Sequence, residues 1–167
     1  MFTLGTKISV EIKKLPHYVH PSQKLPSYVT TGSAGIDLTA SVSYPTTIQA
    51  NQVSLIPTGI ALNINQAGVM FVLCPKSGLG HKKGLILGNT VGIVDSDYQG
   101  EIFVSVWNRR TSNIFGYPIL MINPGDFICQ GIFVPYLQAD FKEVDEFSIN
   151  TDRGALGFGK ATETFSV

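Results

Sequence analysis

Short apolar runs alternate with turn residues along most of this chain. Residues 7–14, KISVEIKK, alternate polar and apolar positions as a half-buried strand does. Further runs rich in Val, Ile, Phe and Thr, which favour strands, are GIDLTASVSY (35–44), QVSLIPTGIALNI (52–64), GVMFVLC (68–74), EIFVSVWN (101–108) and DFICQGIFVPYL (126–137). Their regular spacing predicts an all-β sandwich or barrel, with one short helix near SGLGHKKG (77–84).

Composition narrows the class of protein. The 167 residues are 44% hydrophobic and 14% charged, with 12 basic and 12 acidic residues and a formal net charge of zero. A neutral chain argues against binding nucleic acid or an anionic membrane through its overall charge, so any phosphate binding must come from local clusters. We also expect no membrane span and no signal peptide. Cys74 and Cys129 lack the spacing of a zinc site and are expected to be reduced thiols in a cytoplasmic protein, although a single disulfide stays open.

The segment DRGALGFGKAT (152–162) superficially matches the nucleotide-binding pattern G-x-x-x-x-G-K. Ala161 stands where that pattern needs a hydroxyl, and the expected helix cannot follow because five residues remain after Thr162. Arg153 and Lys160 supply positive charge. Two interpretations stay open here: a glycine-rich phosphate contact or a frayed end of the chain.

Two earlier stretches carry polar residues that are unusual for strand ends. In GSAGIDLTA (32–40), Asp37 is either bonded to backbone N–H groups or lies near a metal or a water molecule. In CPKSGLGHKKG (74–84), Pro75 ends a strand, Ser77 can cap a helix, and Lys76 and Ser77 could contact phosphate oxygens. His81, Lys82 and Lys83 are equally compatible with a solvated surface.

Residues 87–102, LGNTVGIVDSDYQGEI, predict a β-hairpin with Gly92 at a close backbone approach. Its main chain and the Asn89 amide could bond to the edge of a planar base, and Tyr98 could pack on a sugar ring. Asp95 is either a general base or part of an ordinary turn. In GDFICQG (125–131), Gln130 is either a satisfied inward glutamine or a phosphate or water contact.

In this order and spacing, the five stretches resemble the motifs of the trimeric dUTP pyrophosphatases (dUTPases) of the bacterial type. The matching segments are AGIDLTA, PKSGLGHKKG, GIVDSDYQGEI, GDFICQG and RGALGFG, over roughly residues 7 to 159. The resemblance implies a distorted jelly-roll or barrel-like β fold, with a single domain over residues 1–152. It also implies a homotrimer with sites at subunit interfaces, where a flexible tail (153–167) closes over a neighbouring subunit's nucleotide.

Carried over residue by residue, the resemblance assigns roles to the matching positions. Asp95 would orient the attacking water, and Asp37 would support a Mg²⁺ shell through water. The substrate contacts would be Asn89 and the backbone around Ile93, Val94 and Phe103 for uracil, Tyr98 for deoxyribose, Lys76, Ser77, Gly78, Gln130 and Arg153 for phosphates, and Phe158 over the base.

This chain departs from the family pattern in three places. Lys76 stands where the family usually has Arg, which keeps the charge but loses the bidentate fork. Phe127 replaces a usual basic residue, and Lys160-Ala161-Thr162 follows Gly159 in place of a small hydroxyl residue and Gly.

The implied reaction is hydrolysis of dUTP to dUMP and pyrophosphate, which limits uracil in DNA and supplies dUMP for dTMP synthesis. Two alternatives stay open: a dCTP deaminase-like relative, and a non-catalytic dUTP-binding regulator on the same fold.

Overall fold

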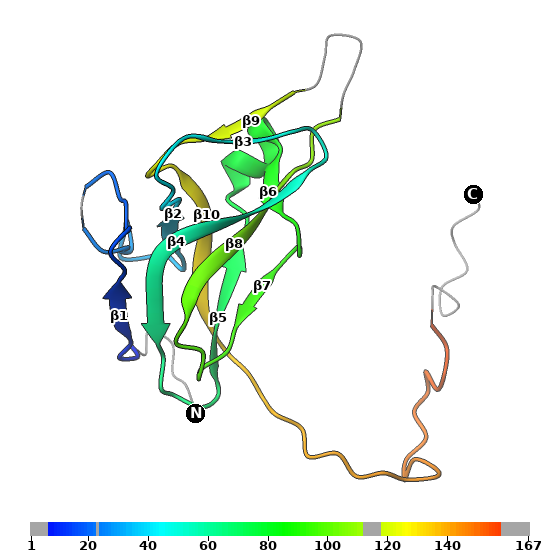
Figure 1. Cartoon of the computed structure of the whole chain (residues 1–167). Helices are drawn as coiled ribbons and strands as arrows, with labels where there is room; N and C mark the ends of the chain where they lie inside the picture. Colours follow the sequence, from blue (N-terminus) through cyan, green and yellow to red (C-terminus); the bar gives the residue numbers. More distant parts are fainter. Residues whose placement is uncertain (1–6, 23, 112–117, 158–167) are drawn as a thin grey trace. The chain divides into compact units, whose positions relative to one another are not determined.

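The regular secondary structure consists almost entirely of strands (Figure 1). A computed structural model describes residues 7–22, 24–111 and 118–157. The elements are β1 (Glu11–Lys14), β2 (Ile36–Thr39), β3 (Thr46–Ile48), β4 (Val53–Asn63), β5 (Val69–Cys74), η1 (Leu79–Lys83), β6 (Leu85–Leu87), β7 (Gly92–Val94), β8 (Glu101–Asn108), β9 (Leu120–Ile122) and β10 (Phe127–Pro135). The predicted all-β class is therefore confirmed.

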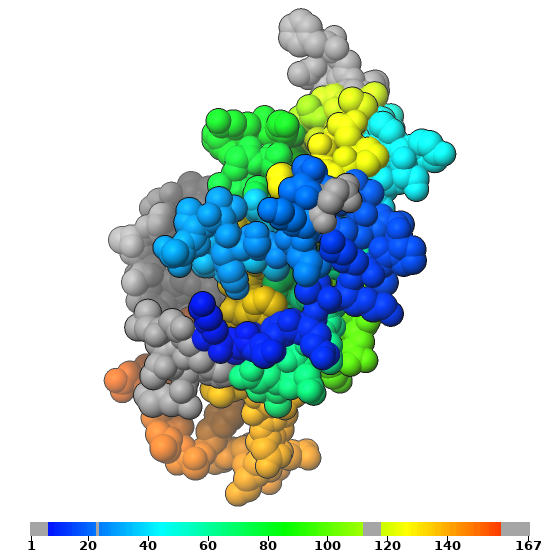
Figure 2. All heavy atoms as spheres, turned by 90° about the vertical axis from the view of Figure 1, so that its left-hand side faces the viewer, coloured from blue at the N-terminus to red at the C-terminus, as the bar shows by residue number. Residues whose placement is uncertain are grey.

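The strands form two four-stranded sheets and one two-stranded ribbon. The first sheet has the order β1-β4-β8-β6, the second has the order β2-β10-β5-β7, and β3 pairs with β9. All of these pairings are antiparallel. Figure 2 shows one face, where the N-terminal part of the chain, in blue, spreads over the molecule with gold atoms of the β10 region visible beneath it.

Strand alternation places the core between the two large sheets. Along β8, the side chains of Ile102, Val104 and Val106 are buried, whereas Phe103 between them is exposed. The opposite sheet contributes Leu38, Phe71 and Ile128, all fully buried. A core of this kind fixes the register, because a slip of one residue would turn every apolar side chain outward.

The predicted strands are confirmed, and all except the one at 101–108 have shorter ends than predicted. The run at 101–108 matches β8, and the runs at 52–64, 68–74 and 126–137 contain β4, β5 and β10. The predicted strand at 7–14 is limited to β1, and the run at 35–44 to β2. The short helix near SGLGHKKG is present as η1, a single wide helical turn.

The chain divides into two units, Met1–Leu137 and Gln138–Val167. The first contains every strand given above. The described residues of the second, 138–157, form turns and extended chain. The domain boundary at residue 152 stays a prediction. In the described residues, no helix has the length and apolar character needed to cross a membrane.

Gly131 in β10 leaves no room for a side chain in the core. A Cβ atom at this position would lie 1.9 Å from Cζ of Phe71, whose ring is fully buried and packs on Phe133. We expect Gly131→Ala to lower the free energy of unfolding by about 1–3 kcal/mol through overpacking. Urea denaturation measures this loss. Gly32→Ala, which would meet no atom within 4 Å, is the control and should unfold like the wild type, so equal stability of the two variants would contradict the packing.

Candidate active site

A cationic concavity opens where β5 ends and η1 begins. Its volume is about 390 Å³, and its lining residues are Lys76, Ser77, Gly78, Leu79, Lys82, Lys83 and Gln130. The structure thus brings together four residues predicted to contact phosphate and adds Lys82 and Lys83, whose role the sequence left open. The predicted Ser77 cap is wrong, because the helical turn has Gly78 at its N-cap and no side-chain cap. Three lysine side chains in one concavity favour a polyanionic ligand.

Lys76 is held by two neighbours at the edge of this concavity. Its ammonium group forms an ion pair with the carboxylate of Asp37, and it lies 5.3 Å from the ring centroid of Phe127, within reach of a cation–π interaction. The two replacements noted in the sequence, Lys76 and Phe127, are therefore neighbours. Asp37 comes to the phosphate concavity from β2, although 39 positions of sequence separate it from Lys76.

Gln130 joins the strands around the concavity. It pairs with Asp37 on β2 and with Cys74 on β5, and its side-chain amide donates a hydrogen bond to the Pro75 carbonyl at 3.0 Å. The interpretation of Gln130 as a satisfied glutamine is thus correct, and the same side chain also lines the concavity. It fixes the backbone from which Lys76 extends.

Both cysteines are free thiols, as expected. Burial raises the pKa of the Cys129 thiol well above its ordinary value, and the nearby Asp37 carboxylate raises that pKa further. A neutral Cys129 adds no negative charge beside the concavity.

The predicted hairpin at 87–102 is wrong in its pairing. The chain does bend after Val94, but β7 pairs with β5 in one sheet, whereas β8 pairs with β4 and β6 in the other. The predicted close approach at Gly92 is present, because a Cβ there would lie 3.0 Å from Leu73. The two arms diverge because β7 extends the sheet of β5, whereas β8 lies between β4 and β6 in the other sheet.

This divergence leaves backbone edges open on both sides of the bend (Figure 1). Within the described ranges, β7 has a partner strand only on its β5 side, and β6 covers β8 only over residues 106–108. Val94 is buried, so its contribution to a ligand would come from the backbone, whereas the side chains of Ile93 and Phe103 are exposed. Open edges of this kind can bond to a planar ligand.

The bend itself presents Asp95 and Tyr98 to solvent. The Tyr98 N–H donates to the Asp95 carbonyl at 3.2 Å, which closes the turn. The Tyr98 side chain is 45% exposed, and Asp95 is exposed as well. Asn89 is also exposed, in the loop before β7, where the positive φ of Thr90 turns the chain.

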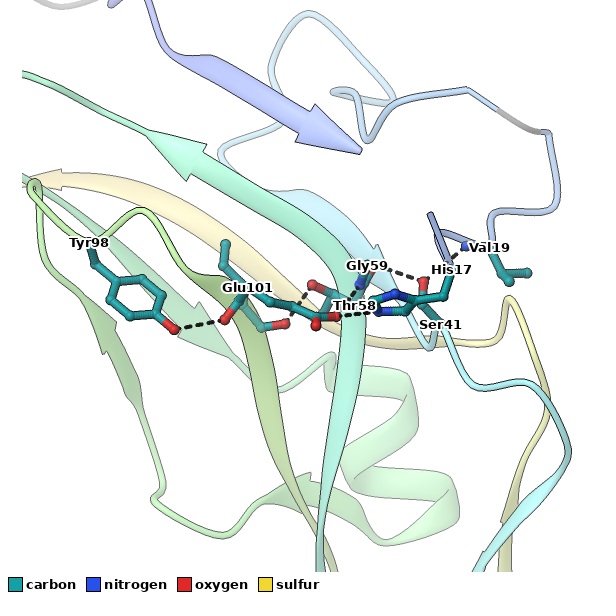
Figure 3. A network of polar contacts seen from close by, with 8 residues as sticks. His17, Val19, Ser41, Thr58, Gly59, Tyr98 and Glu101 are labelled. Atoms are coloured by element: carbon teal, nitrogen blue, oxygen red, sulfur yellow. Dashed lines mark hydrogen bonds and ion pairs between the residues drawn. The ribbon is translucent and has the colours of Figure 1, made fainter. Parts of the chain in front are cut away.

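A polar network behind the bend was missed by the sequence reasoning (Figure 3). Both the backbone and the side chain of Glu101 belong to it. The Tyr98 hydroxyl donates to the Glu101 carbonyl at 2.9 Å. The Glu101 carboxylate accepts a hydrogen bond from the Gly59 N–H at 2.8 Å, and the same carboxylate lies 2.8 Å from Nε2 of His17. The position of Glu101 after the bend was a weak signal, and nothing in the local sequence marked His17.

Asp95 and the cationic concavity lie at opposite ends of β5. Val94 pairs with Phe71, so Asp95 follows near the Met70 end, while Lys76 follows the Cys74 end. The strand from Met70 to Cys74 alone spans about 13 Å. Within one chain, the bend and the cationic concavity are therefore well separated.

The tail residues belong to the second unit of the chain. Arg153 is exposed, and its Nε donates to the Leu156 carbonyl at 3.0 Å within a turn. Phe158 lies outside the described residues, so its assigned role stays a prediction.

Comparisons with known proteins identify relatives of this chain. A family model described as dUTPase matches residues 22–162. The deoxyuridine 5'-triphosphate nucleotidohydrolase of Sodalis glossinidius is 45% identical over 150 residues, which cover 90% of this chain and 95% of that protein. The protein of the same name from Nitrosospira multiformis is 48% identical over 136 residues, covering 81% of this chain and 87% of the relative.

Solved structures show the same fold. A mutant dUTPase of Staphylococcus bacteriophage 80alpha with dUpNHpp has a TM-score of 0.76 at 20% identity, covering 92% of this chain and 98% of that one. A mutant dUTPase from phage phi11 of S. aureus, solved to describe the coordination of a structural Mg(II) ion, has a TM-score of 0.71 at 20% identity and covers 84% of this chain and 99% of the other. With relatives nearly half identical over most of their length and a family model matched over residues 22–162, the chain belongs to the dUTPase family.

Proposed function

We propose that this protein is a dUTP diphosphatase that hydrolyses dUTP to dUMP and pyrophosphate. The observation that carries the proposal is the 45–48% identity to deoxyuridine 5'-triphosphate nucleotidohydrolases over most of the chain. In a cell, the reaction would limit uracil incorporation into DNA and supply dUMP for dTMP synthesis. The two free thiols support the expected cytoplasmic location.

Uracil and deoxyribose would bind at the bend. The open backbone edges around Ile93, Val94 and Phe103, together with the Asn89 amide, offer donors and acceptors to a pyrimidine edge. Cytosine presents donors where uracil presents acceptors, and each unpaired buried group costs about 1–3 kcal/mol. The exposed Tyr98 ring would stack on deoxyribose and leave no room for a 2′-hydroxyl.

Asp95 would position the attacking water and accept its proton. The water oxygen bonds to the α-phosphorus, the bond from that phosphorus to the oxygen bridging to the β-phosphorus breaks, and pyrophosphate leaves. The exposure of Asp95 at the bend supports this role, because a general base must reach a water beside the substrate.

The phosphates would bind in the cationic concavity. Its charge and its lining support contacts from Lys76, Ser77, Gly78 and Gln130, and Lys82 and Lys83 would add to the positive field. Arg153 would meet the γ-phosphate, and Phe158 would lie over the base. With both in place, the tail would exclude water from the site.

Mg²⁺ would be carried mainly by the triphosphate and would supply charge neutralisation there. The donor set fits this arrangement, since no group of three or more His, Cys, Asp or Glu side chains able to hold a metal ion occurs in the described part of the chain. Asp37 is the carboxylate beside the concavity, and it would reach the metal through water. Lys76, which forms an ion pair with Asp37, would then also contact the phosphates of the incoming nucleotide.

We further propose a homotrimer with its active sites between subunits. The separation of the bend from the concavity along β5 supports this, because a site between subunits would bring Asp95 of one chain beside the concavity of another. The first sheet also exposes an apolar stripe on its outer face, formed by Val53, Leu55 and Phe103. Contiguous exposed apolar residues mark association surfaces.

The experiment that tests the function is pyrophosphate release from dUTP, dCTP, dTTP and UTP with magnesium. We expect release from dUTP alone at a substantial rate. Ammonia release from dCTP would favour the deaminase-like alternative. That reaction would need a carboxylate base aimed at the amino group of the pyrimidine, and the Glu101 carboxylate instead contacts the Gly59 N–H and His17. Tight dUTP binding with no pyrophosphate release would favour the regulatory binder.

A further inference from the structure

The orientation of the Tyr98 ring depends on the first residue of β8. With 45% of its surface exposed, the ring is not fixed by packing alone. Its hydroxyl donates to the Glu101 carbonyl at 2.9 Å (Figure 3). The ring lies close over Gly100, where an added Cβ would approach the Tyr98 hydroxyl oxygen to 2.5 Å. The angle of the ring is therefore set by where the Glu101 carbonyl points.

The Glu101 carboxylate in turn fills an irregularity in the neighbouring strand. The register between β4 and β8 shifts between Pro57 and Ala61, and Gly59 at the shift has a φ of +68°. The Gly59 N–H donates to Oε1 of Glu101 at 2.8 Å. A side chain thus takes the place of a ladder partner at the point where β8 begins.

His17 contacts the same carboxylate oxygen of Glu101. Its Nε2 lies 2.8 Å from Oε1 of Glu101, with the His17 side chain 43% exposed and the Glu101 side chain only 14% exposed. The segment around His17 is docked on the same irregularity, since the Leu15 N–H donates to the Gly59 carbonyl at 2.8 Å. Figure 3 shows His17 and Gly59 together beside the Glu101 side chain.

Further hydrogen bonds connect the start of β8 to the neighbouring strand and to the N-terminal segment. The Thr58 hydroxyl donates to the Ile102 carbonyl at 2.6 Å, and the Ser41 hydroxyl donates to the Thr58 carbonyl at 2.8 Å. The Val19 N–H then donates to the Ser41 hydroxyl oxygen at 3.0 Å. The start of β8 is therefore held by side chains at a place where regular strand pairing is interrupted.

We infer that Glu101 is a positioning residue for sugar discrimination, with His17 as its clamp: together they hold the carbonyl that orients the Tyr98 ring against a 2′-hydroxyl. This inference rests on the proposed function, in which Tyr98 packs on deoxyribose. It extends the specificity machinery to His17, which lies outside all five matched motifs.

The test compares kcat/KM for dUTP with kcat/KM for UTP in Glu101→Ala, Glu101→Gln and His17→Ala. We expect Glu101→Ala to lower the dUTP-to-UTP ratio by about tenfold, the size of effect that follows from losing one hydrogen bond. Glu101→Gln keeps an oxygen for the Gly59 N–H and should retain most of the ratio. His17→Ala removes an exposed side chain, so it should fold normally and still lower the ratio. Glu143→Ala, at an exposed glutamate of the second unit, is the control.

A double-mutant cycle separates positioning from a general loss of structure. Tyr98→Phe keeps the ring but removes the hydroxyl bond to Glu101, so adding Glu101→Ala to it should change the ratio no further. An unchanged ratio in both Glu101→Ala and His17→Ala would overturn the inference. A parallel loss of activity toward both nucleotides would also overturn it, because this is the result of a merely structural role. Failure of the wild type to hydrolyse dUTP is a separate result that would overturn the proposed function, and the inference with it.

Discussion

Asp95→Asn should bind a non-hydrolysable dUTP analogue as tightly as the wild type and lose turnover by about 10²–10⁴-fold, the usual contribution of a general base. Asparagine has nearly the same shape as aspartate, so the contacts that bind the nucleotide remain, but it cannot accept a proton from water. The turn should also survive, because its hydrogen bond runs from the Tyr98 N–H to the backbone carbonyl of residue 95. Calorimetry of analogue binding and steady-state pyrophosphate release measure the two quantities separately.

Asp97→Asn is the matched control for this substitution. Asp97 is exposed in the same turn, two residues away, and has no assigned contact with the reacting water. It should retain turnover close to that of the wild type. Equal turnover in both variants would remove Asp95 from its role, and equal loss in both would indicate that the charge of the bend, and not one positioned carboxylate, supports the reaction.

Deletion of residues 153–167 should leave the fold intact and reduce turnover by at least about 10²-fold, the typical cost of a displaced catalytic arrangement. The fold should survive because the last strand in the described part of the chain ends at Pro135 and the first unit ends at Leu137. Turnover should fall because Arg153, Phe158 and Lys160 are removed, and because the proposed closure can no longer exclude water. Thermal unfolding, sedimentation and dUTP hydrolysis together measure these effects.

Deletion of residues 163–167 alone is the control for the longer truncation. It keeps Arg153, Phe158 and Lys160, and it should hydrolyse dUTP nearly as fast as the full chain. Full activity in the longer truncation would reject the closing tail. A lower melting temperature in that truncation would show that the tail supports the fold of the β unit.

Long strands were predictable because their pattern is local. The run EIFVSVWN alternates along its whole length, and β8 matches it residue for residue. The three-residue strands β3 and β6 carry no comparable signal, since they form only because β9 and β8 pair with them. The error in the hairpin has the same origin: local sequence indicates a bend after Val94, but it does not show that β5 competes for β7.

The same distinction between local sequence signals and long-range strand pairing applies to the candidate site. The sequence marked Asp37, Lys76 and Gln130 individually through unusual polar residues at strand ends. Their assembly depends on β10 lying between β2 and β5, which is a property of the whole sheet. The ion pair of Lys76 with Asp37 and the contact of Lys76 with Phe127 were therefore out of reach of a residue-by-residue reading.

The length of β5 between the bend and the cationic concavity has a genetic consequence. In the proposed trimer, an allele that damages the acidic bend and one that damages the lysine cluster would harm different halves of each site. When both alleles are expressed in one cell, some mixed trimers would contain a site that combines an intact bend from one subunit with an intact lysine cluster from another. Two individually defective copies of the gene could then together restore dUTP hydrolysis. This form of complementation is not possible for an enzyme whose site lies within one chain.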